Sequence, residues 1–235
     1  MRGIGRHPAD PKWSDREVCM TYVPVEAPAT GSRQTEIVAV FGDLRNFTAF
    51  AAKAEPNEVI ELLGAYYSAV GAIVDEFRAT LTSLSGDGLM ILVNAPEPCR
   101  RPALRAVRMA MAMQAAMQTL ALGWRARHWA IGYGIGLAKG PATVGRFGCE
   151  RRLDYTAIGT VVNLASRLCS AAADGEILVD AVAAAELGGR IPLDDLGPRA
   201  LKGFDEEIRV FAIAAREAVA PTATRPRSAG ERRLA

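Results

Sequence analysis

Two aspartates in this sequence stand where they could act together on a phosphate group. Asp43 follows the apolar run Thr35–Gly42, and Asp87 lies in Gly86-Asp87-Gly88, a hairpin signal between two apolar runs. If the flanking strands are sheet neighbours, both carboxylates emerge at one edge of the sheet, where they repel each other unless cations bridge them. The alternative is that both aspartates only stabilise turns, as Asp before Gly often does.

Carboxylate oxygens of this kind select the hard cations Mg²⁺ or Mn²⁺. Two such cations about 3.5–4 Å apart can activate an attacking oxygen and stabilise a leaving phosphate oxygen in one in-line displacement. Asp43 and Asp87 are therefore a candidate site for two divalent metal ions.

A second candidate is the pair Asn163 and Arg167. The spacing predicts a helix over 160–173 with Thr160 as its N-cap, so residues four apart share a face beside the apolar stripe. An amide and a guanidinium aimed together into a cleft suit a negatively charged phosphorus centre. The alternative is an ordinary solvated helix face.

Hydrophobic periodicity places the elements that must position these side chains. It predicts long helices over 56–79 and 103–122, the latter with methionines as core filler. Strands are expected at 35–42, 81–85, 89–93, 129–138, 143–148, 153–158, 176–179, 193–196 and 207–213. The segment 143–148 is expected to pair back on the strand before it. Interleaved helices and hairpins favour an α+β sandwich, with helices covering a mixed sheet.

Glycines recur at alternate positions of the expected strand 129–138, at Gly132, Gly134 and Gly136. Because alternate residues share one face of a strand, a backbone or a ligand is expected to approach closely there. No helix follows directly, so this is not a dinucleotide-binding fingerprint.

Composition bounds the remaining possibilities. The 235 residues carry a net charge of +2, which argues neither for nor against a nucleic acid partner, and no run approaches the ~20 apolar residues that span a bilayer. The four cysteines have neither zinc nor paired spacing, which favours free thiols in a reducing cytoplasm. Residues 1–34 are expected to form a linker or leader, 35–215 the catalytic domain, and 216–235 a disordered basic tail.

The string Asp154-Tyr-Thr-Ala-Ile-Gly-Thr-Val-Val-Asn-Leu-Ala-Ser-Arg167 resembles a motif of the class III nucleotidyl cyclases, Asp-Tyr-Thr-x-x-Gly-x-x-Val-Asn-x-Ala-x-Arg. Phe41-Gly-Asp-Leu-Arg-Asn-Phe-Thr48 and Ser85-Gly-Asp-Gly-Leu-Met90 resemble two further motifs of that family, and the three occur in the family's order. The resemblance spans about Glu36 to Ile213. It implies a ferredoxin-like βαββαβ core with a mixed, mainly antiparallel sheet.

The resemblance also assigns roles. Asp43, Asp87 and the carbonyl of Leu44 would bind two metal ions, and Asn163 and Arg167 would position the ribose and stabilise the α-phosphorus. The remaining implied contacts are the backbone amides of Asn46, Phe47 and Thr48 with the phosphates, and Lys202 with the triphosphate tail. Asn46 replaces a usual Gly, although Asn tolerates the left-handed conformation better than most residues.

Base recognition departs from the family pattern. Ser83 stands where the family's base-reading Lys is usual, and Thr156 occupies the position of that Lys's partner, so discrimination in favour of adenine is weakened.

The resemblance implies a homodimer with shared sites that converts ATP to cyclic AMP and pyrophosphate, with no nucleic acid or membrane partner for this chain. A cyclase for GTP or a pyrimidine nucleotide, or a non-catalytic nucleotide-binding dimer, is the alternative.

Overall fold

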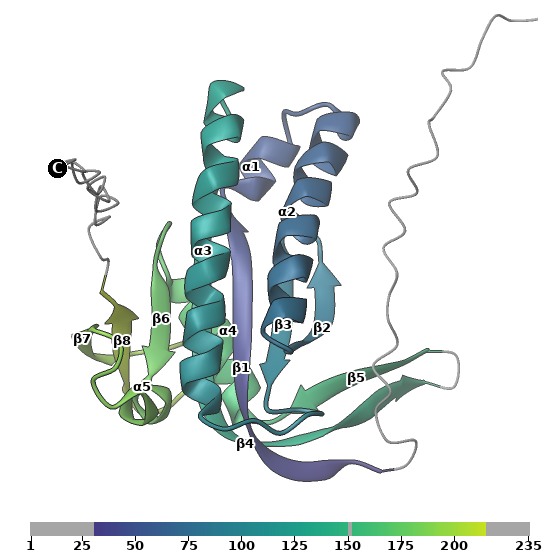
Figure 1. The fold of residues 1–235 in the computed structure, drawn as a ribbon. Helices are drawn as coiled ribbons and strands as arrows, with labels where there is room; N and C mark the ends of the chain where they lie inside the picture. Colours follow the sequence, from purple (N-terminus) through teal and green to yellow (C-terminus); the bar gives the residue numbers. More distant parts are fainter. Residues whose placement is uncertain (1–30, 150–151, 215–235) are drawn as a thin grey trace, which may run out of the picture.

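The computed structural model describes residues 31–149 and 152–214 (Figure 1). The elements in chain order are β1 (Arg33–Arg45), α1 (Phe47–Ala51), α2 (Pro56–Glu76), β2 (Thr80–Ser85), β3 (Gly88–Val93), α3 (Pro102–Ala126), β4 (Gly132–Cys149), β5 (Arg152–Ile158), α4 (Thr160–Ala171), β6 (Ile177–Asp180), α5 (Ala181–Leu187), β7 (Leu193–Arg199) and β8 (Ile208–Ile213).

The strands form one sheet in the order β2-β3-β1-β4-β6-β8-β7, with β5 added to the far end of β4. Among the strand pairs within residues 31–149 and 152–214, only β4–β6 is parallel. The α+β fold with a mixed, mainly antiparallel sheet is thereby confirmed, and β1 and β3 are neighbours, as the argument about the two aspartates requires.

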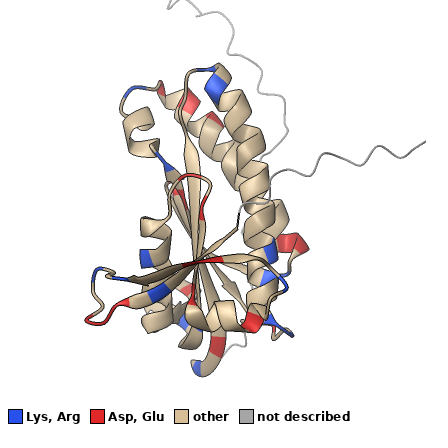
Figure 2. Cartoon of the chain, turned by 90° about the vertical axis from the view of Figure 1, so that its left-hand side faces the viewer, with Lys and Arg blue, Asp and Glu red and all other residues tan. Residues whose placement is uncertain are grey.

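Helices cover both faces of the sheet, as the view from its edge shows (Figure 2). Alternate residues of β1 point to opposite sides: Val38, Val40 and Leu44 join the core under α2, α3 and α5. Ile37 and Ala39 join a second core, under α4. Asp43 and Arg45 therefore belong to the α4 face of the sheet.

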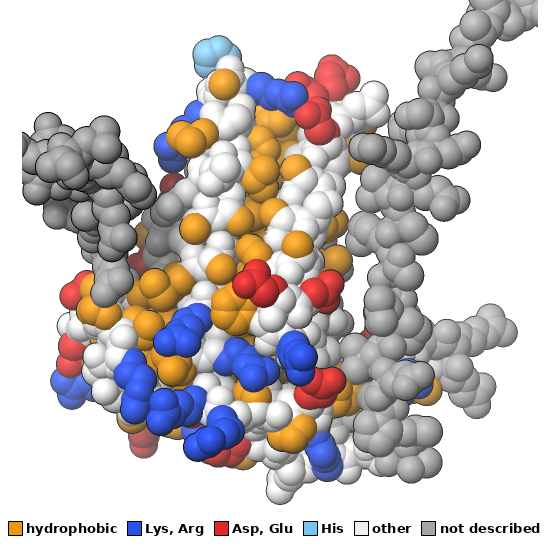
Figure 3. All heavy atoms as spheres, viewed as in Figure 1, with side chains coloured by type: hydrophobic (Ala, Val, Ile, Leu, Met, Phe, Trp, Pro, Cys, Tyr) orange, Lys and Arg blue, Asp and Glu red, His pale blue; other side chains and the backbone are white. Residues whose placement is uncertain are grey.

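Local sequence explains where the long helices begin. α2 starts with Pro56 and a capping box in which the side chains of Glu55 and Glu58 bond to each other's backbone amides. α3 also starts with a proline and buries Met109, Met113 and Met117, confirming that these methionines are core filler. In the space-filling view, apolar side chains follow the seam between the two helices, and basic side chains gather around the lower end of α3 (Figure 3).

One strand prediction was wrong: 143–148 does not pair back but continues β4 to Cys149. The Gly140-Pro141 pair suggests a turn, yet Pro141 stays in register with Glu36 of β1. On its other edge β4 pairs with β6 up to Leu137 and with β5 from Thr143, so the missing N–H of Pro141 faces a gap in the ladder.

Smaller differences concern helix starts. The five-residue α1 was not predicted, because so short a helix has no periodic pattern. The N-cap of α4 is the extended Gly159 rather than Thr160, which is the first helical residue.

The expected linker and basic tail lie almost wholly outside the described residues. In the part of the chain that is described, no helix is long and apolar enough to cross a membrane. Cys99, Cys149 and Cys169 are free thiols there.

Candidate active site

The structure places Asp43 and Asp87 side by side. Asp43 is in register with Gly88 of β3, and a β-carbon on Gly88 would lie 3.4 Å from Asp43 Oδ1. Asp87 occupies the tip of the β2–β3 hairpin, where its carbonyl oxygen accepts a 3.3 Å bond from the amide of Leu44. The Tyr67 hydroxyl donates to the carbonyl of Gly86, so α2 holds the same tip.

The two carboxylates are close enough to perturb each other. Burial raises the pKa of Asp43, and the charge of Asp87 raises it further, while Arg45 opposes both effects. The Arg45 guanidinium lies 2.6 Å from Asp43 Oδ2. The half-buried negative charge of Asp43 is thus only partly neutralised by Arg45.

A cavity of about 300 Å³ opens beside these groups. Asp43 and Met90 line it from the sheet, and Ser83 and Ser85 line it from β2. Ser166, Cys169 and Ser170 of α4 form the remaining wall.

The alternating glycines of β4 allow α4 and its neighbours to approach the sheet. A β-carbon on Gly136 would lie 2.0 Å from the backbone nitrogen of Cys169. On Gly134 it would lie 2.2 Å from Arg45 Nη2, and on Gly132 it would overlap the Asp174 carboxyl group. The expected approach of another backbone is confirmed at Gly136, whereas at Gly134 and Gly132 the close neighbour is a side chain.

Asn46 forms the turn between β1 and α1. Its φ of 63° is left-handed, which explains why a Gly-like residue is needed, and its side chain donates to the carbonyl of Ala130 at 3.0 Å. The Phe50 amide bonds to the Asn46 carbonyl, so residues 47–49 form the amide-bearing first turn of α1. Phe47 packs against the core and Thr48 is exposed.

Asn163 and Arg167 do not line the Asp43 cavity of their own chain. The buried face of α4 consists of Val161, Ala165, Leu168 and Cys169, whereas Asn163 is exposed and Arg167 is half-buried. Lys202 is also exposed, beside Leu201, which packs in the α4 core. The candidate residues thus fall into two separate sets.

The two positions expected to contact the base lie on strands that approach each other. Ser83 is on β2 and lines the cavity, while Thr156 is on β5 and pairs with Gly145 of β4. β5 curves from β4 toward β2, so the two strands come into contact.

Sequence reasoning missed Arg45 and the α4 residues of the cavity wall. Arg45 could have been noticed, because it stands two residues after Asp43 on a strand and so shares its face. Nothing in the sequence indicated its contacts with α4. Leu44 is buried in the α2–α3 core, so only its backbone can serve the site.

The donor set fits a hard divalent cation. Two adjacent carboxylates and a nearby backbone carbonyl offer oxygen only, and in the described residues no group of three or more His, Cys, Asp or Glu side chains could hold a metal. The protein alone gives too few ligands for a closed metal cage. This is typical of sites that Mg²⁺ completes with substrate phosphates and water.

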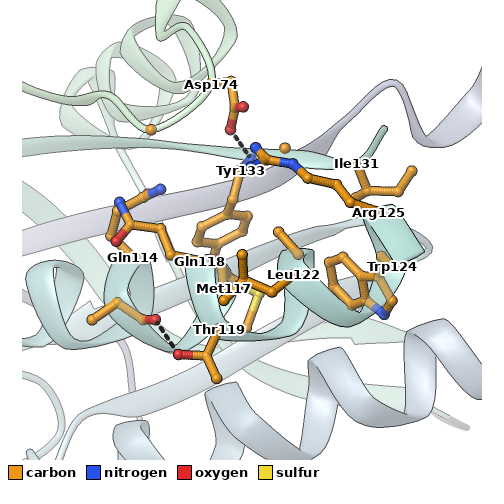
Figure 4. Close-up of a pocket in the computed structure, with 14 residues that line it drawn as sticks. Gln114, Met117, Gln118, Thr119, Leu122, Trp124, Arg125, Ile131, Tyr133 and Asp174 are labelled. Carbon is orange, nitrogen blue, oxygen red and sulfur yellow. Dashed lines mark hydrogen bonds between the residues drawn. The ribbon is translucent and has the colours of Figure 1, made fainter. Parts of the chain in front are cut away.

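A cavity larger than the one beside Asp43 lies elsewhere in the described residues. It measures about 630 Å³ and is bounded by the second half of α3, the start of β4 and the Asp174-Gly175 turn (Figure 4). Gln114, Thr119 and Arg125 are among its polar lining residues. It lacks paired carboxylates, so it is not a candidate for the same chemistry.

Comparison with known proteins shows the family of this chain. Residues 30–215 match the family described as the adenylate and guanylate cyclase catalytic domain. Adenylate cyclase 1 of Rhizobium meliloti is 28% identical over 205 residues, covering 82% of this chain and 31% of that protein, so the chain spans about a third of this relative's length.

Solved structures agree as well. The adenylyl cyclase CyaB of P. aeruginosa is 30% identical, with a TM-score of 0.77 over 80% of this chain and 98% of the other. The guanylyl cyclase Cya2 is 27% identical, with a TM-score of 0.72 over 81% of this chain and 98% of the other. On the extent of the family match and the shared fold, this chain belongs to the adenylate and guanylate cyclase catalytic domain family, the class III nucleotidyl cyclases.

Proposed function

We propose that this chain forms a homodimer that converts ATP to 3′,5′-cyclic AMP and pyrophosphate. The observation that carries the proposal is the division of the candidate residues into two sets. Asp43 and Asp87 meet at one edge of the sheet, whereas Asn163 and Arg167 of α4 are not among the residues that line the cavity beside them. A second copy, related by a two-fold axis, would bring its Asn/Arg set over the aspartates of the first and form two equivalent sites.

Each residue then has a defined part. Asp43, Asp87 and the Leu44 carbonyl hold two Mg²⁺ or Mn²⁺ ions, which when bound supply charge neutralisation at the attacking and leaving oxygens. The amides at Asn46, Phe47 and Thr48 bind the β- and γ-phosphates, as the start of a helix can. Lys202 of the second copy reaches the triphosphate tail.

Asn163 orients the ribose so that its 3′-oxygen faces the α-phosphorus. That oxygen forms the new bond while the bond to the pyrophosphate oxygen breaks, and Arg167 stabilises the charge at phosphorus. The protein contributes mainly positioning and electrostatics.

ATP is preferred because the Rhizobium and P. aeruginosa relatives are named as adenylate cyclases. GTP is the second candidate, because the similar Cya2 is named as a guanylyl cyclase and Ser83 is not the usual Lys. A pyrimidine nucleotide or a non-catalytic nucleotide-binding dimer is less well supported. A non-catalytic protein has no chemical need for both sets of residues.

The test is a panel of the four nucleoside triphosphates with Mn²⁺, followed by detection of pyrophosphate and cyclic product. We expect turnover of ATP above the other three. Product from GTP alone would reassign the substrate, and no product from any of them would refute the enzyme.

A complementation experiment tests the shared site. Asp43→Ala and Arg167→Ala chains should each be inactive alone. Mixed after dissociation, they should recover about a quarter of wild-type turnover, because half of the dimers are mixed and each has one intact site. No recovery in a mixture that contains the mixed dimer would refute the shared site.

A further inference from the structure

Arg45 contacts two parts of the protein that serve different sites in the proposed dimer. Its Nη1 bonds to Asp43 Oδ2 at 2.6 Å. Its Nε bonds to the carbonyl of Ala172 at 3.1 Å, and its Nη2 donates to the carbonyl of Cys169. One guanidinium therefore joins a proposed metal ligand to the last turn of α4.

The surroundings of Arg45 supply both the acceptors and the space that its guanidinium needs. A helix end has carbonyl groups without partners in the helix, and a cation there is stabilised by the helix dipole. Arg45 is only 19% exposed, and Gly134 leaves the space that its guanidinium occupies. The planar fork of Arg reaches all three acceptors at once, which a Lys point charge cannot do.

The contact also fixes how Asp43 is presented. Arg45 occupies Oδ2, while Oδ1 is the oxygen near Gly88, on the side of the Asp87 hairpin. Asp43 is thereby held with one oxygen toward the cavity edge that the two carboxylates share.

We propose that Arg45 is a positioning residue that couples the two active sites of the dimer, because it ties the acid of one site to the helix that serves the other. The inference rests on the proposed function. Arg167 lies only two residues before Cys169, so a shift of the anchored end of α4 shifts the group that closes over the partner's substrate.

The first experiment separates positioning from general destabilisation. Arg45→Gln should lower kcat by roughly tenfold, the scale of losing a charge-assisted contact at a reacting site. Mn²⁺ affinity, measured by electron paramagnetic resonance with 3′-deoxy-ATP and in parallel with 3′-deoxy-GTP, should hold or tighten, because a competing cation next to Asp43 has gone.

Arg209→Gln is the matched control. It removes a surface arginine that pairs with Asp195 on β7, and it should change neither quantity. An unchanged kcat for Arg45→Gln, or a parallel loss of kcat and Mn²⁺ affinity, would overturn the positioning role. If Arg45→Gln does not fold, Arg45→Lys replaces it: kcat should fall, because Lys cannot reach all three acceptors, while Mn²⁺ affinity should stay near the wild-type value, because a cation remains next to Asp43.

The second experiment tests the link itself in the mixed dimer of Asp43→Ala and Arg167→Ala chains. Its one intact site takes Asp43 from the Arg167→Ala chain and α4 from the Asp43→Ala chain. Arg45→Gln should lower turnover when placed in either chain. An effect from only one placement would refute the link, since Arg45 would then serve a single site.

The outcomes distinguish this inference from the proposed function. If wild type makes no cyclic nucleotide, the cyclase proposal fails. If wild type is active but the unmodified mixture is not, the shared site fails and the link fails with it. If both are active and the Arg45 placements have no effect, only the coupling role of Arg45 is wrong.

Discussion

Gly136 of β4 lies directly beneath the backbone of Cys169 in α4: a β-carbon at Gly136 would stand 2.0 Å from the Cys169 nitrogen and 2.5 Å from the Ala165 carbonyl oxygen. The helix that carries Asn163 and Arg167 can therefore pack at its present depth only over a glycine. The atoms in the way belong to a helix backbone, which cannot rotate aside as a side chain could.

We expect Gly136→Ala to lower the free energy of unfolding by about 3 kcal/mol, because the added methyl group must displace α4. Gly71→Ala is the control, since nothing lies within 4 Å of a β-carbon there. In the interior of α2 it should raise stability by up to about 1 kcal/mol. Urea unfolding of both variants measures this difference, and equal effects would contradict the packing.

Removal of one acid should separate stability from activity. Asp87→Asn relieves the repulsion that helps to raise the pKa of Asp43, so the metal-free protein should gain about 0.5 kcal/mol of stability. Turnover should fall at least about a hundredfold, because a proposed metal ligand is lost.

Thermal unfolding with and without Mn²⁺ plus nucleotide, alongside a turnover assay, checks both effects. Mn²⁺ should stabilise wild type more than the variant. Asp75→Asn, an exposed change on α2, should alter neither quantity. Full turnover by Asp87→Asn would contradict the metal assignment.

Whether a feature of the fold or of the candidate site could be predicted from the sequence depends on how far apart its interacting residues are along the chain. Asp43 and Asp87 could be paired from sequence, because an apolar strand and a hairpin next to it are local patterns. The course of β4 through Pro141 could not, because it depends on which strands pair on its far edge. The role of Arg45 depends on carbonyls 124 and 127 residues away, and no pattern around Arg45 reports them.

The pair Lys139–Glu186 joins β4 to α5, whose Glu186 also bonds to the start of α3, and the pair should contribute stability over a defined pH range. Glu186 Oε2 lies 3.0 Å from Lys139 Nζ, and Oε1 accepts the amide of Ala103 at 2.9 Å. Glu186→Gln keeps the second bond and should cost about 0.5–1 kcal/mol, whereas Glu186→Ala loses both and should cost about 2 kcal/mol.

The hydrogen bond from Lys139 to Glu186 raises the pKa of Lys139 above its usual 10.5. Because the pKa of Lys139 is higher in the folded state than in the unfolded state, the pair gives its full stabilisation below the unfolded-state pKa. This stabilisation is lost as pH rises through the folded-state pKa. The stability difference between wild type and Glu186→Gln should thus be constant from pH 7 to 9 and vanish above the folded-state pKa. A difference that persists far into alkali would show that charge is not its cause.

Base selection offers a gain-of-function prediction. The Ser83 hydroxyl can either donate or accept a hydrogen bond, so it distinguishes the acceptor N1 of adenine from the donor N1–H of guanine only weakly. A Lys at this position can only donate, so Ser83→Lys should raise the ratio of kcat/KM for ATP to that for GTP by about tenfold or more.

Ser85→Lys is the control, because it adds the same charge to the same cavity two residues nearer the hairpin tip. It should change both substrates alike. If the two variants shift the ratio equally, a general charge effect accounts for the change, and Ser83 does not contact the base.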